Sequence, residues 1–224
     1  ILPEFMSLVD DPTLTDFRGM PLNGHYRYDD EGVAARKVTL IEDGVLKNFL
    51  MCRKPVRSFP SSNGHGRRSL GRIAVARQGT LMVESRQTVP PERLREMLIE
   101  ECRSQGKPYG YVFLDIEGGF TFTGRSFPQA FKVLPLLVKR VHTDGRPDEL
   151  VRGVDIVGTP LTSLEQILAV GDDPVVFNGI CGAESGSVPV SAVSGSILVK
   201  SIEIQKATHE QDRPPILSAP DAAK

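Results

Sequence analysis

The sequence predicts an α+β fold dominated by antiparallel β-sheet, with a few short helices. Many short apolar runs are separated by clusters of turn-forming residues. Only two segments carry convincing helix signals, and strands do not alternate with helices as they would in a βαβ protein. With 224 residues, 40% of them hydrophobic, the chain can bury a sizeable core as one large domain or two small ones.

The most distinct local signal is Asp43-Gly44, a pair typical of a two-residue hairpin turn. It lies between apolar runs at residues 38–41 and 45–50, which we expect to form the two strands of a hairpin. Further strands are expected at residues 72–76 and 80–84.

Two polar stretches in this part of the chain predict loops. Residues 29–32 offer three carboxylates but lack the further alternating oxygen ligands of a calcium loop, so we interpret them as a turn. Residues 53–72 contain several prolines, glycines and serines without a hydrophobic period, which predicts a long loop. Lys and Arg cluster between Arg53 and Arg77, and we interpret this cluster as a solvated loop, with a local anionic partner as the alternative.

Two segments predict helices. Pro90-Pro91 opens the clearer one, apolar residues follow at helical spacing, and Gly106 stops it. Cys102 lies on or beside its apolar face, which favours a buried structural thiol. Residues 162–168 predict a second, short helix, in which a Thr or Ser cap is followed three positions later by an acidic or amide residue.

The remaining apolar runs predict strands. Pro135 interrupts one of them, which favours an edge or bulged strand over a straight helix. Gly118-Gly119 lies between two others, and residues 142–145 predict a turn. The strands are expected at residues 109–116, 120–123, 130–141, 151–157, 175–177 and 196–206, and the polar, Pro-rich residues 207–224 predict a disordered tail.

Composition limits the classes of function. Lys and Arg number 27 against 28 Asp and Glu, so no domain-wide positive field is available and we expect no nucleic-acid partner. Three widely spaced cysteines do not make a disulfide framework, which fits a reducing compartment, and we expect a cytoplasmic protein. No apolar run approaches the length of a membrane span, so we expect no membrane partner.

Cys181 is the strongest candidate for chemistry. Gly179 and Gly182 flank it closely, and glycines let a backbone approach a ligand. Such a setting suits a reactive or metal-binding thiolate better than a core filler. The histidines stand far apart, and His209 begins a zinc-protease-like motif that has Arg213 in place of the second histidine. The residues therefore leave three readings of the thiol open: metal ligand, nucleophile paired with a histidine, or inert side chain.

Several segments, taken together and in order, resemble the TldD/PmbA family, also called modulator of DNA gyrase, whose members are zinc-dependent peptidases. The resemblance implies a C-terminal domain of this family at residues 7–206, while residues 1–6 look like a leader added during cloning. The matching segments are residues 9–13, 28–32, 40–47, 63–68, 118–119, 153–160 and 179–190.

The resemblance implies a specific role for Cys181. In the family a His-Glu-x-x-x-His helix upstream of this region supplies two zinc ligands and a general base, and a cysteine before a Ser-Val-Pro-Val-like stretch supplies the third protein ligand. Cys181 stands at that position, and the histidine motif has no counterpart in this chain. We therefore expect Zn²⁺ in the full-length protein, and neither tight zinc nor peptidase activity in this chain alone.

The resemblance also implies partners. A peptide substrate is expected in a cleft lined by Asn63, Gly64, Gly118 and Gly119, and a homo- or heterodimer with a family member is expected. The alternative function is a non-catalytic interaction or substrate-binding module, such as a zinc-less partner subunit, although such a subunit has no need of the Cys181 thiol. Action on DNA, as the older family name suggests, fits the balanced charge poorly.

Overall fold

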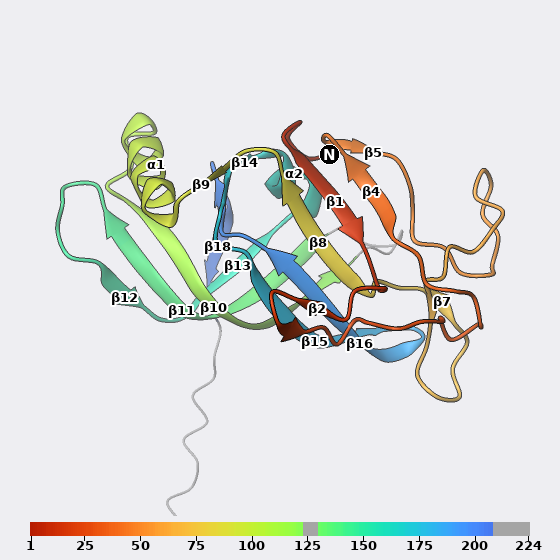
Figure 1. The fold of residues 1–224 in the computed structure, drawn as a ribbon. Coiled ribbons are helices and arrows are strands. Elements are labelled where there is room, and N and C mark those ends of the chain that lie inside the picture. Colours follow the sequence, from red (N-terminus) through yellow and green to blue (C-terminus); the bar gives the residue numbers. More distant parts are fainter. Residues whose placement is uncertain (123–129, 208–224) are drawn as a thin grey trace, which may run out of the picture.

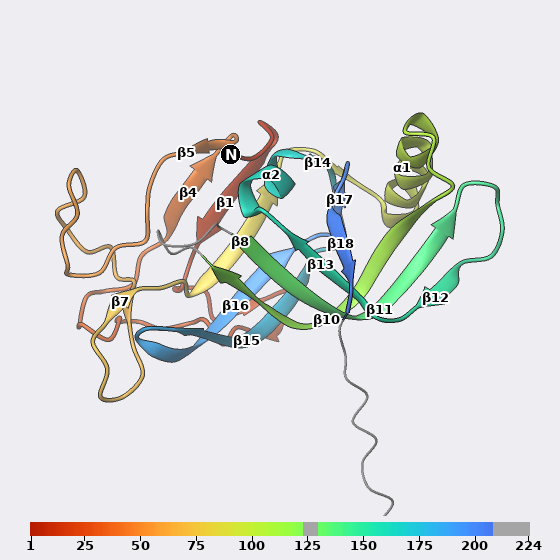
Figure 2. The ribbon, with the colours of Figure 1, turned by 180° about the vertical axis from the view of Figure 1, so that it is seen from behind.

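The computed structural model of the protein describes residues 1–122 and 130–207. Strands dominate these residues, and the two helices are short, as the α+β prediction requires. In Figures 1 and 2 helix α1 and the strands β10 to β12 occupy one end of an elongated molecule, and a six-stranded sheet occupies the other. The part of residues 207–224 predicted as a tail lies, from residue 208 onward, outside the described residues.

The six-stranded sheet joins strands from residues 6–85 to strands from residues 175–194. All its neighbouring strands are antiparallel except β16 and β8, which run parallel. Asp43 and Gly44 both have positive φ, 48° and 76°, which confirms the predicted hairpin turn. In spatial order the strands are β15 (Val175–Ala183), β16 (Gly186–Ser194), β8 (Thr80–Ser85), β1 (Met6–Asp10), β4 (Val38–Glu42) and β5 (Val45–Leu46).

A five-stranded sheet is built around two long strands, β10 (Tyr109–Phe122) and β11 (Ala130–His142). The two strands expected at 109–116 and 120–123 are therefore one strand over its described part, because bulges absorb the irregular stretch opposite Pro135. The prediction of an edge or bulged strand is confirmed in its bulged form. Strand β11 is not an edge strand, because it pairs with β10 on one side and with β13 on the other. The remaining strands are β12 (Glu149–Val151), β13 (Val154–Gly158) and β18 (Glu203–Lys206).

The described residues also form three smaller sheets. A three-stranded sheet joins β17 (Ile197–Val199), β14 (Ile167–Gly171) and β9 (Thr88–Val89). The single strand expected at 196–206 is wrong, since β17 and β18 belong to different sheets. Two-residue strands form the other pairs, β2 (Asp16–Phe17) with β3 (Met20–Pro21) and β6 (Gly66–Arg67) with β7 (Val75–Ala76).

The sequence predicted the bounds of the first helix better than those of the second. Helix α1 (Pro91–Ser104) begins and ends as predicted, with Gly106 at a φ of 66° just beyond it. Helix α2 (Pro160–Glu165) begins two residues before the predicted start, because Pro160 fits the first helical turn, and it ends before Ile167 and Leu168, which belong to β14 instead. Its N-cap is Thr159, whose side chain makes no capping hydrogen bond, so the predicted cap is wrong.

The core lies where the three-stranded sheet meets its neighbours. One buried cluster joins Met6 of β1 to Ile167 and Val170 of β14, and Leu2 and Phe5 pack against it. A second cluster joins Leu94 of α1 to Ala169 and Leu198. Leu2 and Phe5 thus pack on the domain, while the assignment of residues 1–6 to an added leader stays a prediction. Within residues 1–122 and 130–207, no helix is long and apolar enough to span a membrane.

Candidate functional site

Cys181 lies in strand β15, which among the described strands pairs only with β16 and forms the outer edge of the six-stranded sheet. It stands opposite Val188, three residues from the tight turn at Glu184-Ser185. Its thiol is free and half-buried, whereas Cys52 and Cys102 are buried. Burial raises the pKa of the Cys102 thiol, in keeping with its predicted structural role. Of the three cysteines, Cys181 is the least buried.

A buried arginine holds the hairpin formed by β15 and β16 on both sides of its turn. Arg77, which is 6% exposed, donates from Nη2 to the Cys181 carbonyl oxygen at 2.5 Å. Its Nη1 donates to the Gly186 carbonyl oxygen at 3.0 Å and to Ser185 Oγ at 2.8 Å. One side chain therefore fixes the main chain of Cys181 together with the turn that follows it.

A second set of hydrogen bonds comes from the same arginine-rich segment. Arg67 donates from Nη1 to the carbonyl oxygens of Pro189 and Gln78, both at 2.7 Å. Ser69 donates from Oγ to the Ser187 carbonyl oxygen at 2.7 Å. The interpretation of residues 53–77 as a solvated loop is thus wrong for Arg67 and Arg77, because main-chain carbonyls satisfy their buried guanidinium groups.

Arg67 also stacks on Tyr26. Its guanidinium carbon lies 4.7 Å from the centre of the Tyr26 ring. Burial lowers the pKa of Arg67 and raises the pKa of Tyr26 well above its ordinary value, so Tyr26 is a neutral phenol. The Tyr26 hydroxyl donates to the Gly64 carbonyl oxygen at 2.9 Å, which ties the stack to the predicted cleft residues.

Asn63 and Gly64 are fixed by their backbone surroundings. Asn63 Oδ1 accepts from the Met51 N–H at 2.8 Å, and its Nδ2 donates to the Phe49 carbonyl oxygen at 2.9 Å. Gly64 has a φ of 81°, and a Cβ there would lie 2.3 Å from the Ala34 carbonyl oxygen. Both residues therefore have clear structural roles, and their place in a substrate cleft stays a prediction.

A buried pair, Asp10 and His65, lies directly beside them. His65 Nε2 is 3.2 Å from Asp10 Oδ1, and neither side chain is exposed. His65 Nδ1 is 3.0 Å from Asn63 Oδ1, and the His65 carbonyl oxygen accepts from the Arg77 N–H at 2.9 Å. A continuous path of contacts thus runs from Asn63 through His65 and Arg77 to Cys181.

Gly118 and Gly119 lie elsewhere. They stand inside β10, opposite Leu134 and Val133 of the five-stranded sheet, so they form no turn. Among the described residues, no hydrogen bond joins them to Asn63 or Gly64. The structure therefore brings one pair of predicted cleft residues toward the Cys181 hairpin and places the other pair in a different sheet.

The described part of the chain lacks a full set of metal-ligating side chains in one place. Residues 1–122 and 130–207 contain no group of three or more His, Cys, Asp or Glu side chains that could hold a metal ion. His209 of the rejected motif lies outside them. A catalytic zinc takes three protein ligands, so Cys181 does not form such a site by itself.

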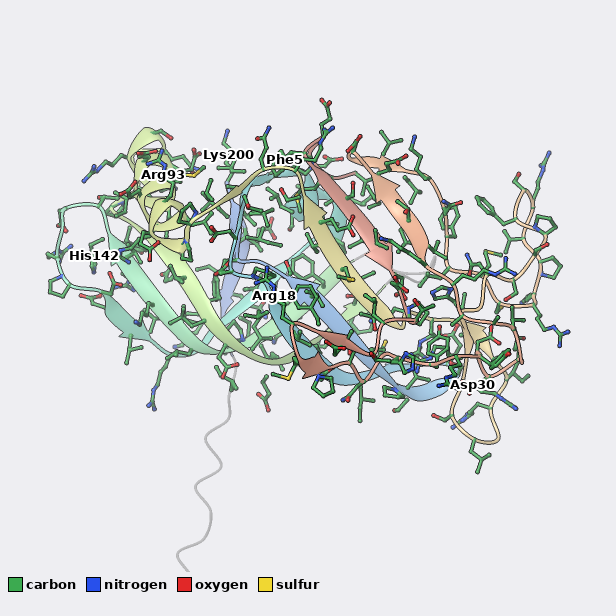
Figure 3. The ribbon with its side chains drawn as sticks, in the orientation of Figure 1. Phe5, Arg18, Asp30, Arg93, His142 and Lys200 are labelled. Carbon is green, nitrogen blue, oxygen red and sulfur yellow. The ribbon has the colours of Figure 1, made fainter. Side chains whose placement is uncertain are left out.

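One cavity lies apart from this hairpin. About 370 Å³ in volume, it lies between α1, the start of β10 and residues 199–204, and Cys102, Tyr109 and Tyr111 line it. Figure 3 shows Asp30 at the end of the molecule that carries the six-stranded sheet, whereas Arg93 and His142 lie at the α1 end.

Comparisons with known proteins give a consistent picture. The model of the PmbA/TldA metallopeptidase C-terminal domain matches residues 1–206. A metalloprotease of Archaeoglobus fulgidus is 28% identical over 201 residues, covering 90% of this chain and 42% of that protein. A zinc metalloprotease TldD homolog of Saccharolobus solfataricus is 25% identical over 204 residues, again covering 90% and 42%.

A solved structure shares the fold. TldE from Thermococcus kodakarensis superposes with a TM-score of 0.61 and 20% identity, over 91% of this chain and 40% of that one. The chain thus spans less than half the length of the proteins it matches.

Proposed function

The chain belongs to the PmbA/TldA metallopeptidase C-terminal domain family, and from this premise we propose that it serves a zinc-dependent peptidase by contributing one zinc ligand and part of the substrate cleft. The ligand is the Cys181 thiolate. The observation that carries the proposal is the contrast among the cysteines: two are buried, while the third is half-exposed on an edge strand whose main chain a buried arginine fixes.

The proposed site is shared, because within residues 1–122 and 130–207 no group of three metal-ligating side chains completes it. Thiolate is a preferred zinc ligand, and a catalytic zinc with three protein ligands keeps a position for water. When bound, the metal supplies Lewis-acid polarisation of a peptide carbonyl and a more acidic water. The part played by the described residues is to present the thiol of Cys181 at a fixed place on the sheet edge.

Strand β15 also supports a peptide as the substrate. Its outer edge has no neighbouring strand among the described residues, and the side chains of Val175, Phe177 and Ile180 are exposed. An extended peptide beside this edge would gain main-chain hydrogen bonds with little selectivity for side chains. We place Asn63 and Gly64 on the Cys181 side of this cleft, and Gly118 and Gly119 on a more distant wall.

Pairing with a family member is part of the proposal. Large apolar side chains are exposed along the β10–β11 ribbon, among them Leu114, Phe122 and Leu136 at 51%, 59% and 59%. Exposed apolar surface of this extent is typical of an interface.

The test of the ligand is Cys181→Ser in a protein that contains this domain together with a His-Glu-x-x-x-His helix. We expect that variant to lose bound zinc and peptidase activity, because a hydroxyl is a far poorer zinc ligand than a thiolate. Metal analysis and peptide hydrolysis measure the two losses, and Cys102→Ala is the matched control because its thiol is buried away from the edge strand. Full zinc content and activity in Cys181→Ser would refute the ligand assignment.

A further inference from the structure

We infer that Arg77 is the positioning residue for Cys181, holding the tip of the β15–β16 hairpin in the conformation that presents the thiol. This inference rests on the proposed role of Cys181 as a ligand. Because the inference concerns only contacts within this chain, it can be tested without a bound metal.

The hairpin needs an anchor because its tip extends past the sheet. Strand β8 pairs with β16 only at residues 191–193. Residues 181–188 have no third strand beside them, and within the described chain their ladder bonds run only between β15 and β16. A two-stranded ribbon without a third strand is only marginally stable by itself.

Arg77 supplies contacts of the kind that a third strand would make, beside those of Ser69, whose N–H donates to the Ser185 carbonyl oxygen at 2.8 Å and whose Oγ donates to the Ser187 carbonyl oxygen at 2.7 Å. Its guanidinium binds the carbonyl oxygens of Cys181 and Gly186, which lie before and after the turn. The guanidinium is planar and carries five donors, so it can join several acceptors in one fixed arrangement. Because the carbonyl of Cys181 is held, rotation of its peptide unit is restricted, and with it the direction in which the side chain leaves the strand.

The arginine is itself held in place. Its N–H donates to the carbonyl oxygen of His65, whose ring is fully buried against Asp10. Ser185, also fully buried, accepts from the guanidinium at 2.8 Å. No carboxylate pairs with Arg77 among the described residues, so its charge is directed entirely at the main chain and hydroxyl of the hairpin.

The experiment uses three variants of the chain as it stands: Ser185→Ala, Arg77→Lys and Arg77→Met. Two rates are measured on each: hydrogen exchange of the amides at residues 181–188, and alkylation of Cys181 by N-ethylmaleimide followed by peptide mass spectrometry. We expect roughly fivefold faster rates in Ser185→Ala, from the loss of one hydrogen bond, and a rise of more than about tenfold in Arg77→Met. Arg77→Lys is expected to fall between the other two, because lysine keeps the charge but not the planar fork.

The matched control is Arg103→Lys. Arg103 also donates to a main-chain carbonyl, that of Thr143, but from the last turn of helix α1. It is expected to leave both rates unchanged.

Two outcomes overturn the inference: unchanged rates at residues 181–188 in the Arg77 variants, or equal acceleration in strands β10 and β11, which would show a global loss of stability. If Arg77→Met does not fold, Ser185→Ala decides, since it removes a single hydroxyl group. A failure here leaves the zinc result for Cys181→Ser untouched, and the reverse also holds.

Discussion

Cys102 illustrates how burial alone sets the chemistry of a side chain. Its sulfur lies on the inner face of α1, so close to β10 that a Cβ at Gly110 would be 2.8 Å from it. Desolvation, assisted by the neighbouring Glu101, raises the pKa of its thiol above the ordinary 9.0. The thiol therefore remains protonated in the folded protein at a pH at which it ionises in the unfolded chain.

This difference predicts the direction of a pH dependence. Because the folded state binds the proton more tightly, the contribution of Cys102 to stability is complete below pH 9.0 and declines as the pH rises above it. Urea unfolding at pH 8 to 10 should show a falling free energy of unfolding, and Cys102→Ala should flatten that fall. Tyr26, whose pKa is also raised, adds to the fall only near pH 10, its ordinary value, and it does so equally in the variant. An identical slope in the variant would contradict the prediction.

Strand β10 shows at the scale of an element that two adjacent glycines can have different roles. A Cβ at Gly119 would lie 2.5 Å from the Lys132 carbonyl oxygen, on the main chain of β11, whereas a Cβ at Gly118 would meet nothing within 4 Å. The two glycines thus mark a close approach of two backbones at one position and open space at the next.

The pair predicts opposite outcomes for the same substitution. Gly119→Ala should destabilise the protein by about 1–3 kcal/mol, because main-chain atoms cannot move aside as a side chain can. Gly118→Ala is the matched control and should be neutral or stabilising by about 0.5–1 kcal/mol, since alanine loses less entropy than glycine in a strand. Thermal or urea unfolding measures both changes. Equal effects would show that the two backbones are not in close contact at Gly119.

At the scale of the whole molecule, the Asp10–His65 pair joins three segments that are distant in sequence. Asp10 ends β1, His65 directly precedes β6, and the carboxylate of Asp10 also accepts from the N–H groups of Gly79 and Thr80 at the start of β8. The loop that supports the Cys181 hairpin is therefore connected to the centre of the six-stranded sheet through one buried carboxylate.

Asp10→Ala should cost about 3–5 kcal/mol of stability, because it leaves buried donors on His65 and on the main chain without a partner. The control is Asp16→Ala: that carboxylate is exposed and accepts from the Gly19 N–H at 3.2 Å, so its loss should cost less than about 1 kcal/mol. Urea unfolding compares the two variants, and similar losses would show that the buried pair does not link these segments.

The sequence alone determined the features that depend on neighbouring residues. Asp43-Gly44 specified its turn, Pro91 and Gly106 bounded α1, and the ordered motifs identified the family, because each signal acts within a few positions of the chain. The same local reasoning placed α2 two residues late, because the fit of Pro160 to the first turn outweighed the apparent Thr or Ser cap.

The tertiary structure decided which distant residues meet. Arg77 appeared only as one positive charge in a polar stretch, and its partners lie 104 to 109 residues further along the chain. A guanidinium becomes buried only when carbonyl oxygens replace its water, and the strand pairing that brings those oxygens together is not encoded in any short pattern. Cys181 stood out as a candidate because its flanking residues lie next to it in the sequence. Arg77, which holds it, meets it only in the folded chain.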